Sequence, residues 1–268
     1  MDQFPDGHHV WLRSRVHGTY LRADKDGDGV SLSRRRMSMK AAWVVHLYGD
    51  DQHVLLHSAA YGSYLSATNA STPLGCRGCR VALRNYDDGD DVAVRWQPVR
   101  AGLGDEIWLR RVTRVAKGDL YGYLRANGRH FPYNVVSFDD FYNVSTMMEW
   151  VVQPIPSSER IPRLPRPPRQ WLRLSALLSS RLVMGNGDIS FTFRGRSVFL
   201  LRNELIRLLG FSPNVYDNLV MYVLAGRYGR LTPLVVNLPR NRQTLVILIT
   251  AEAPANGGLR YPDFVQRR

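Results

Sequence analysis

The first half of the chain repeats one pattern three times, and this repeat limits the choice of fold more than any other feature. Each copy carries a short strand-like segment, a glycine, the tetrapeptide Tyr-Leu-x-Ala and, further on, a tryptophan before another strand-like run. The copies are marked by Tyr20, Tyr64 and Tyr123 and by Trp43, Trp96 and Trp150. The three tryptophans lie 53 and 54 residues apart, and a fixed period of this length indicates a repeated supersecondary unit.

The repeated half is predicted to be all-β. Its apolar residues alternate over short segments, and clusters of glycine and aspartate such as Gly102–Asp105 separate those segments. Three such units can close on one another and so leave no exposed sheet edge. The predicted shared core is Leu12, Leu21, Leu56, Leu65, Leu109 and Leu124, with the three tryptophans closing each unit. This architecture favours a binding scaffold over a catalytic cleft.

Length and composition favour a globular, intracellular protein. The 268 residues suffice for one large domain or two ordinary ones, and 44% of them are hydrophobic. No apolar run approaches the roughly 20 residues that cross a bilayer, so we expect no membrane span. The first nine residues lack the basic and apolar regions of a secretory signal, and only two cysteines occur. We therefore expect a cytoplasmic location, with the nucleus as the alternative.

Positive charge is concentrated in the second half of the chain. The formal net charge is +13, of which residues 1–153 carry +2 and residues 154–268 carry +11. A basic half can attract nucleic acid, an anionic membrane or an acidic protein surface. The arginines are scattered rather than gathered in one run, so a solvated face enriched in arginine explains them equally simply.

A segment rich in proline and arginine, residues 154–170, is predicted to be a linker. Six prolines between Pro154 and Pro168 favour an extended, semi-rigid spacer. The pattern PxxP occurs twice, from Pro162 to Pro165 and from Pro165 to Pro168. Such a segment can dock in an aromatic groove, but neither copy has an arginine at the usual flanking spacing. A linker is the favoured interpretation.

The second unit, residues 171–252, is predicted to be a small α+β domain. A turn at Gly185–Asp188 indicates a β-hairpin, and apolar spacing predicts a helix over 197–209 with Ser197 as its N-cap and Gly210 at its end. Three further strands are predicted at 219–225, 233–236 and 244–250. One helix against one sheet face follows from this order. Residues 253–268 are expected to form a flexible tail.

These residues resemble a plant family of domains of unknown function, family 569. The resemblance rests on the threefold pattern, on Pro73–Gly75 before Val81 and, more tightly, on the stretches 191–198, 229–236 and 238–241. It implies a fascin-like β-trefoil over 1–153 and a ubiquitin-like (β-grasp) domain over 171–252. It also implies a relation of the trefoil to actin-cross-linking proteins. It implies no activity, and no catalytic or ligand residues can be carried over.

Two short motifs suggest a metal or redox site, but neither is complete. Asp24-Lys25-Asp26-Gly27-Asp28-Gly29 matches the first half of a calcium loop, whose twelfth position must supply an acid; here that position is Arg35. An exposed acidic turn is therefore the better interpretation. Cys76 and Cys79 form a CxxC, but a zinc site needs two more ligands and a redox motif needs a βαβ context. We predict no metal and no cofactor.

The sequence predicts a non-catalytic protein-interaction or scaffold protein that the resemblance connects with actin. No catalytic residues are predicted, since nothing near His57 supplies a nucleophile and an orienting acid. A carbohydrate-binding trefoil is an alternative, although the Gln-x-Trp repeat of lectin trefoils is replaced here by Ala41, Val94 and Met148 two positions before the tryptophans. Nucleic-acid binding through the basic half is a second alternative, with stacking by Phe191, Phe193, Tyr222 and Tyr228.

Overall fold

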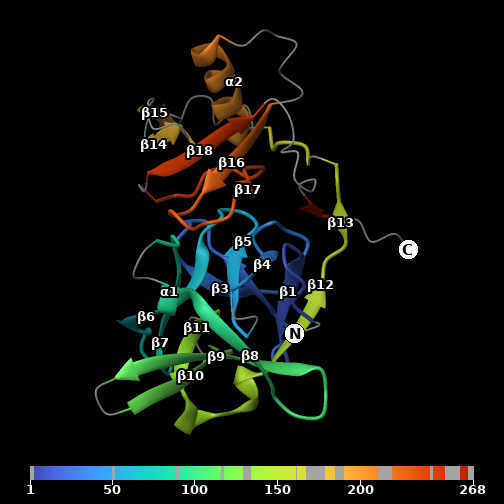
Figure 1. The fold of residues 1–268 in the computed structure, drawn as a ribbon, viewed down its shortest axis with the longest axis vertical. Helices are drawn as coiled ribbons and strands as arrows, with labels where there is room; N and C mark the ends of the chain where they lie inside the picture. Colours follow the sequence, from blue (N-terminus) through green and yellow to red (C-terminus); the bar gives the residue numbers. More distant parts are fainter. Residues whose placement is uncertain are drawn as a thin grey trace.

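The computed structural model shows two domains joined along one junction (Figure 1). It describes residues 3–49, 52–87, 91–115, 118–128, 134–160, 162–166, 179–184, 190–210, 219–241, 244–250 and 260–264. The first domain holds the three sequence repeats. In the second domain the sheet lies between its helix and the first domain, so the helix faces away from the junction.

Each repeat supplies four strands to the first domain. The first repeat supplies β1 (His9–Ser14), β2 (Tyr20–Ala23), β3 (Val30–Ser33) and β4 (Trp43–Leu47). The second supplies β5 (Val54–Ser58), β6 (Tyr64–Ser71), β7 (Cys79–Arg84) and β8 (Arg95–Arg100). The third supplies β9 (Glu106–Val115), β10 (Gly118–Ala126), β11 (Val136–Asp140) and β12 (Trp150–Pro154). Short helical turns lie at α1 (Asp91–Val94), η1 (Phe141–Asn143) and η2 (Thr146–Met148).

Six of these strands close into an antiparallel barrel. β1 pairs with β4, β4 with β5, β5 with β8, β8 with β9, β9 with β12 and β12 again with β1. The remaining strands form the hairpins β2–β3, β6–β7 and β10–β11, which cap the barrel. The first domain is therefore a β-trefoil, and the closed, threefold arrangement predicted from the repeats is confirmed.

The same hydrogen bond occurs in every repeat. The indole N–H donates to the carbonyl oxygen of the leucine in Tyr-Leu-x-Ala: Trp43 to Leu21 at 3.1 Å, Trp96 to Leu65 at 2.9 Å and Trp150 to Leu124 at 2.9 Å. These tryptophans and leucines are fully buried, as are Leu12, Leu56 and Leu109. Each bond satisfies a buried indole and ties a barrel strand to the hairpin of its own repeat. The predicted trefoil core is confirmed.

The second domain folds one helix onto one face of a five-stranded sheet. Its elements are β14 (Ser179–Met184), β15 (Ser190–Arg194), α2 (Val198–Leu209), β16 (Val220–Leu224), β17 (Thr232–Pro233) and β18 (Leu245–Thr250). The strand order is β15-β14-β18-β16-β17, with β14 parallel to β18. The Ser197 hydroxyl accepts from the Leu200 amide, and Gly210 ends α2 in the left-handed conformation. The predicted helix and its caps are confirmed.

One predicted strand is shorter than expected. The apolar run 233–236 predicts a strand of four residues, whereas β17 covers only Thr232–Pro233. Pro233 has no amide hydrogen and cannot donate to a ladder, which limits the pairing of this strand with β16. The predicted hairpin turn at 185–188 lies outside the described residues.

The linker and the tail are more ordered than the sequence predicts. β13 (Ser157–Ser158) pairs with β19 (Tyr261–Pro262), and the ring of Phe264 stacks on Trp11 at 6.4 Å. Tyr261 is buried, and the linker residue Leu164 packs against the core of the second domain. Among the described residues, Ser157–Ser158 and Leu164 of the predicted linker and residues 261–264 of the predicted tail thus make defined contacts. Two-residue strands leave no periodic pattern that could predict this pairing.

Replacing Trp96 by alanine should lower the free energy of unfolding by about 3–5 kcal/mol, because a large core aromatic and its hydrogen bond are both lost. Urea denaturation of the full chain measures the change. Trp108 is a partly buried tryptophan of the same domain, so Trp108→Ala is the control and should cost less. Equal losses in the two variants would show that Trp96 is not a central core residue.

Candidate functional site at the domain junction

The first part of the junction is the turn between β2 and β3, residues 24–29. The amide of Arg240 donates to the Lys25 carbonyl at 2.9 Å, and the amide of Asn241 donates to the Asp26 carbonyl at 3.0 Å. Gly27 has φ +81° and lies against Pro239 so closely that any side chain there would overlap the proline ring. The segment that resembles half a calcium loop is therefore a docking turn for the second domain.

The three carboxylates of this turn have partners in the turn or in the strands beside it. Asp24 accepts from the Ser31 hydroxyl, and the Asp26 carboxylate accepts from the amides of Asp28 and Gly29. Asp28 lies 3.6 Å from the guanidinium of Arg84. Aspartate that accepts from amides two and three positions ahead is typical of a tight turn. Among the described residues, no group of three His, Cys, Asp or Glu side chains is arranged to hold a metal ion.

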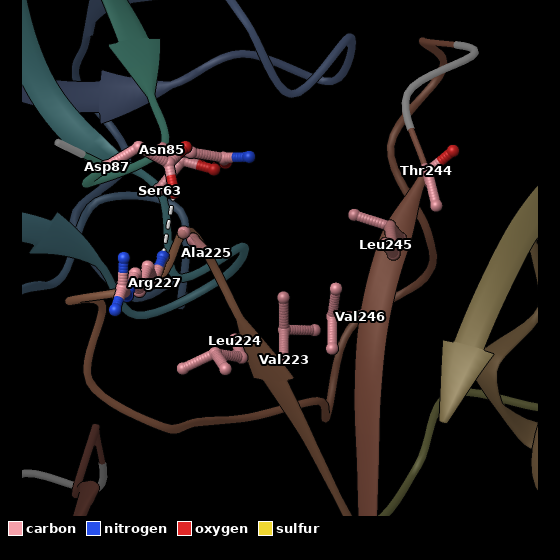
Figure 2. Close-up of a pocket in the computed structure, with 11 residues that line it drawn as sticks. Ser63, Asn85, Asp87, Val223, Leu224, Ala225, Arg227, Thr244, Leu245 and Val246 are labelled. Carbon is pink, nitrogen blue, oxygen red and sulfur yellow. Dashed lines mark hydrogen bonds between the residues drawn. The ribbon is translucent and has the colours of Figure 1, made fainter. Parts of the chain in front are cut away.

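The second part of the junction is a backbone contact beside a small pocket. The Tyr86 amide donates to the Ala225 carbonyl at 2.9 Å, and the Tyr228 amide donates to the Tyr86 carbonyl at 3.0 Å. Figure 2 shows the neighbouring pocket of about 300 Å³, with the Arg227 amide donating to the Asp87 carboxylate at 2.7 Å. The trefoil side of the pocket is polar, whereas Val223, Leu245 and Val246 line the other side. A pocket with one polar and one apolar wall is typical of a contact between two domains rather than of a binding site for an apolar ligand.

The third part of the junction is a chain of buried polar groups. The Arg230 amide donates to the Tyr64 hydroxyl at 2.9 Å, and this hydroxyl lies 3.1 Å from Nδ1 of His46. The Tyr64 hydroxyl accepts from the Arg230 amide, which leaves its own proton available to Nδ1 of His46. His57 is fully buried in the trefoil and meets the Thr232 hydroxyl at 3.1 Å. Arg230 and Thr232 of the second domain thus bond to Tyr64 and His57 of the trefoil.

An ion pair closes one side of this chain of groups. The Arg230 guanidinium donates to both carboxylate oxygens of Asp6, at 2.8 and 2.9 Å. Burial alone would raise the pKa of Asp6, but hydrogen bonds from the Leu47 amide and from Arg230 lower it below its usual value. Asp6 and Arg230 are 224 positions apart, so the pair exists only when both domains are folded and docked.

The three histidines of this region stay neutral at pH 7. Burial lowers the pKa of His9 to about 4, and the neighbouring charge of His8 adds to the shift. Burial, helped by the Arg230 guanidinium, lowers the pKa of His46 to about 4 as well. Burial also lowers the pKa of His57 well below its ordinary value, and the nearby His46 and His9 contribute smaller shifts in the same direction. The junction is thus built for uncharged imidazole.

A larger groove of about 630 Å³ lies where the linker crosses the second domain. Its floor is apolar and is formed by Leu164, Phe199 and the start of β16, and its rim carries Arg163, Arg166 and Arg202. Arg163 and Arg166 are exposed, and Nε of Arg202 is buried with no hydrogen-bond partner among the described residues. The described lining residues include no acid. This groove, called the arginine groove below, suits an acidic ligand with apolar side chains.

The remaining residues singled out in the sequence have structural positions. Cys76 and Cys79 are free thiols, each partly exposed. Phe193 and Tyr222 are buried in the second domain and cannot stack on bases, whereas Tyr228 is exposed beside Tyr86; the side chain of Phe191 lies outside the described residues. The positions two before the tryptophans are fully buried: Ala41, Val94 and Met148.

Sequence reasoning missed the residues that join the domains. Asp6, Tyr64 and Arg230 belong to no local motif, and their contacts span 166 to 224 positions. The one available signal was indirect: the turn at 24–29 has strong acidic character but lacks the twelfth ligand of a calcium loop. Among the described residues, neither helix has the length and apolar character that a bilayer crossing requires.

The fold and its junction define a β-trefoil protein that carries a docked ubiquitin-like domain. Residues 1–153 match the family described as a β-trefoil domain of unknown function, DUF569, and residues 182–250 match the ubiquitin-like domain associated with it. The chain belongs to this family. Among curated proteins, none matches this chain.

Solved structures similar to this chain include several trefoils. A Caenorhabditis elegans protein of unknown function is 17% identical, with TM-score 0.45, over 56% of this chain and 96% of its own. The ricin B-like lectin of Macrolepiota procera, solved with lactose, is 16% identical, with TM-score 0.43, over 56% and 96%. The designed threefold-symmetric protein ThreeFoil is 20% identical, with TM-score 0.42, over 54% and 97%.

Replacing Gly27 by alanine should weaken the docking of the two domains. Both Gly27 and Gly7 have positive φ, but a side chain at Gly7 would meet nothing within 4 Å. Gly7→Ala should therefore cost about 1 kcal/mol from backbone strain alone, and Gly27→Ala about 1–3 kcal/mol more because of the overlap with Pro239. Denaturation midpoints measure both changes, and limited proteolysis reports whether the domains separate. Equal costs would show that the turn does not support the junction.

Acid should destabilise the protein between pH 7 and pH 5. The pKa of His9 is lowered from 6.5 to about 4 in the folded chain. Between these two pH values the imidazole is protonated in the unfolded chain and neutral in the folded chain. The stabilisation is complete above pH 6.5 and is lost as the pH falls toward 4; for His9 alone the loss at pH 5 is about 2 kcal/mol. Urea denaturation at pH 7, 6 and 5 tests this. His9→Gln should reduce the loss of stability between pH 7 and pH 5 by about 2 kcal/mol. The same loss in this variant as in the wild type would contradict the prediction.

Proposed function

We propose that this chain is a non-catalytic protein-binding module whose arginine groove holds an acidic, partly apolar segment of a partner. The observation that supports the proposal is the groove itself, with three arginines on its rim, an apolar floor and no acid among its described lining residues. Exposed arginines attract carboxylates at long range, and an apolar floor supplies the burial that fixes a bound segment.

The arrangement of the junction supports a non-catalytic role. His46 and His57 could serve as bases, but they are hydrogen-bonded to Tyr64 and, across the junction, to Thr232. A base has to reach a substrate proton, and these imidazoles are engaged with protein groups, His57 in a fully buried position. The trefoil then acts as the platform on which the binding domain is fixed, which is a scaffold role.

Filamentous actin is the first partner to test. The family resemblance connects this trefoil with actin-cross-linking proteins, and the strongly basic second half offers charge to an acidic filament. One groove on one chain suits filament binding rather than cross-linking, because cross-linking needs two sites or a dimer. Nucleic acid is the alternative for the same positive surface, and a carbohydrate ligand is the alternative for the trefoil.

Co-sedimentation of the full chain with actin filaments tests the proposal. Replacing Arg163 and Arg166 together by glutamate reverses the charge of the exposed rim and should weaken binding about tenfold. Arg34 and Arg35 are exposed arginines of the trefoil, so Arg34→Glu with Arg35→Glu is the control with the same change of charge. The control pair should bind as the wild type does.

Three outcomes would count against the proposal. Equal weakening by both pairs of substitutions would show attraction by overall charge rather than by the groove. Binding of a nucleic acid that the groove substitutions abolish would favour the nucleic-acid alternative. A wild-type chain that does not pellet with filaments would remove actin as the partner.

A further inference from the structure

Five basic residues gather where the docking turn meets the second domain. Three backbone hydrogen bonds bring their segments together: Ala23 to the Lys40 carbonyl at 2.8 Å, Arg240 to the Lys25 carbonyl at 2.9 Å, and Leu238 to the Arg196 carbonyl at 2.8 Å. The trefoil contributes Arg22, Lys25 and Lys40, and the second domain contributes Arg196 and Arg240. We call this group the junction cluster; it is separate from the arginine groove.

Lys40 lies at the centre of the junction cluster without a counter-ion. Its ammonium nitrogen is 5.6 Å from the ring centre of Tyr61, and among the described residues no carboxylate forms an ion pair with it. Burial, followed by the charges of the four other cluster residues, lowers the pKa of Lys40 to about 8. A half-buried cation surrounded by like charges is unfavourable unless an anion compensates.

Two buried donors in the same place lack acceptors. Tyr61 is 3% exposed, and its hydroxyl has no hydrogen-bond partner among the described residues. Nε of Arg22 is also buried and without a partner. The Lys40 ammonium lies 5.6 Å from the centre of the Tyr61 ring, and Arg22 precedes Ala23, whose amide donates to the Lys40 carbonyl, so both donors belong to the region around Lys40. Buried donors without acceptors are rare in folded proteins and indicate a missing partner.

The two acids nearest the cluster, Asp24 and Asp26, already have partners. Asp24 accepts from the Ser31 hydroxyl and lies 3.6 Å from Nη2 of Arg22, which leaves Nε of Arg22 free. Asp26 accepts from two amides of its own turn. Two engaged carboxylates therefore face five cations, and the junction cluster keeps an excess of positive charge and of donors.

We propose that the junction cluster binds a small phosphate-bearing anion, whose oxygens accept from the Tyr61 hydroxyl, from Nε of Arg22 and from the Lys40 ammonium. A multivalent phosphate matches the excess of cations better than a single carboxylate, and it offers several acceptors to donors that converge from different segments. Arg196 and Arg240 would approach the same anion from the second domain. The ligand would thus hold the two domains together, whatever partner the arginine groove binds.

Calorimetric titration of the full chain with pyrophosphate, at constant ionic strength set with sodium chloride, tests this inference. We expect saturable binding and a higher unfolding temperature in the presence of pyrophosphate. Tyr61→Phe removes one donor to a charged ligand and should weaken binding about tenfold. The unliganded variant should be as stable as the wild type or more stable, because the lost hydroxyl had no partner.

Lys40→Gln is the second variant and should also weaken binding about tenfold, by removal of a charge-assisted hydrogen bond. Arg207→Gln is the control, because Arg207 is exposed on α2 and pairs with Glu204 instead. The inference is overturned if pyrophosphate raises the unfolding temperature no more than chloride at equal ionic strength. It is also overturned if Tyr61→Phe and Lys40→Gln both bind pyrophosphate as tightly as the wild type and Arg207→Gln do.

Discussion

The hydrogen bond from each core tryptophan to a leucine carbonyl is the interaction on which the rest of the structure depends. It connects a barrel strand with the hairpin of its own repeat, and it does so three times. In the second repeat, the carbonyl of Leu65 is held by Trp96, and the preceding residue, Tyr64, carries the hydroxyl that receives the Arg230 amide. The junction can be built with a single rigid geometry because its trefoil side is fixed from within.

The second domain docks at one of the three equivalent positions. The tyrosines of Tyr-Leu-x-Ala start from the same place in each repeat, and the Tyr64 hydroxyl accepts from the Arg230 amide of the second domain. Tyr20 packs edge-on against Trp11 at 6.4 Å, and Tyr123 packs against Trp108 at 5.4 Å. Tyr64 also has an aromatic neighbour, Tyr86 at 5.4 Å, but its hydroxyl accepts from the Arg230 amide of the docked domain. The symmetry builds the scaffold, and the departures from symmetry determine where a partner can attach.

The sequence predicts the elements whose causes are local, and it misses those whose causes are not. The threefold core is visible because identical residues recur at a fixed period, and α2 is visible because Ser197 and Gly210 mark its ends. The junction is invisible, because Asp6 and Arg230 meet only after both domains fold. The turn at 24–29 shows the limit most clearly. Arg35 at the twelfth position already favours a tight turn over a calcium loop, but nothing in the local pattern shows that this turn docks on the second domain. Gly27 lies against Pro239, which is more than 200 positions away in the sequence.

Positive charge gathers in two physically different environments of this protein. At the arginine groove, Arg163 and Arg166 are hydrated, so their charges cost little in the free protein and are screened by salt. At the junction cluster, Lys40 is half-buried among like charges, and salt screens such a group far less. An anion at the cluster would therefore reduce the repulsion between like charges that is already present in the folded chain. A segment in the groove would instead gain its binding free energy from the burial of its own apolar side chains. For this reason the cluster favours a small, highly charged ligand, and the groove favours a longer one with apolar side chains.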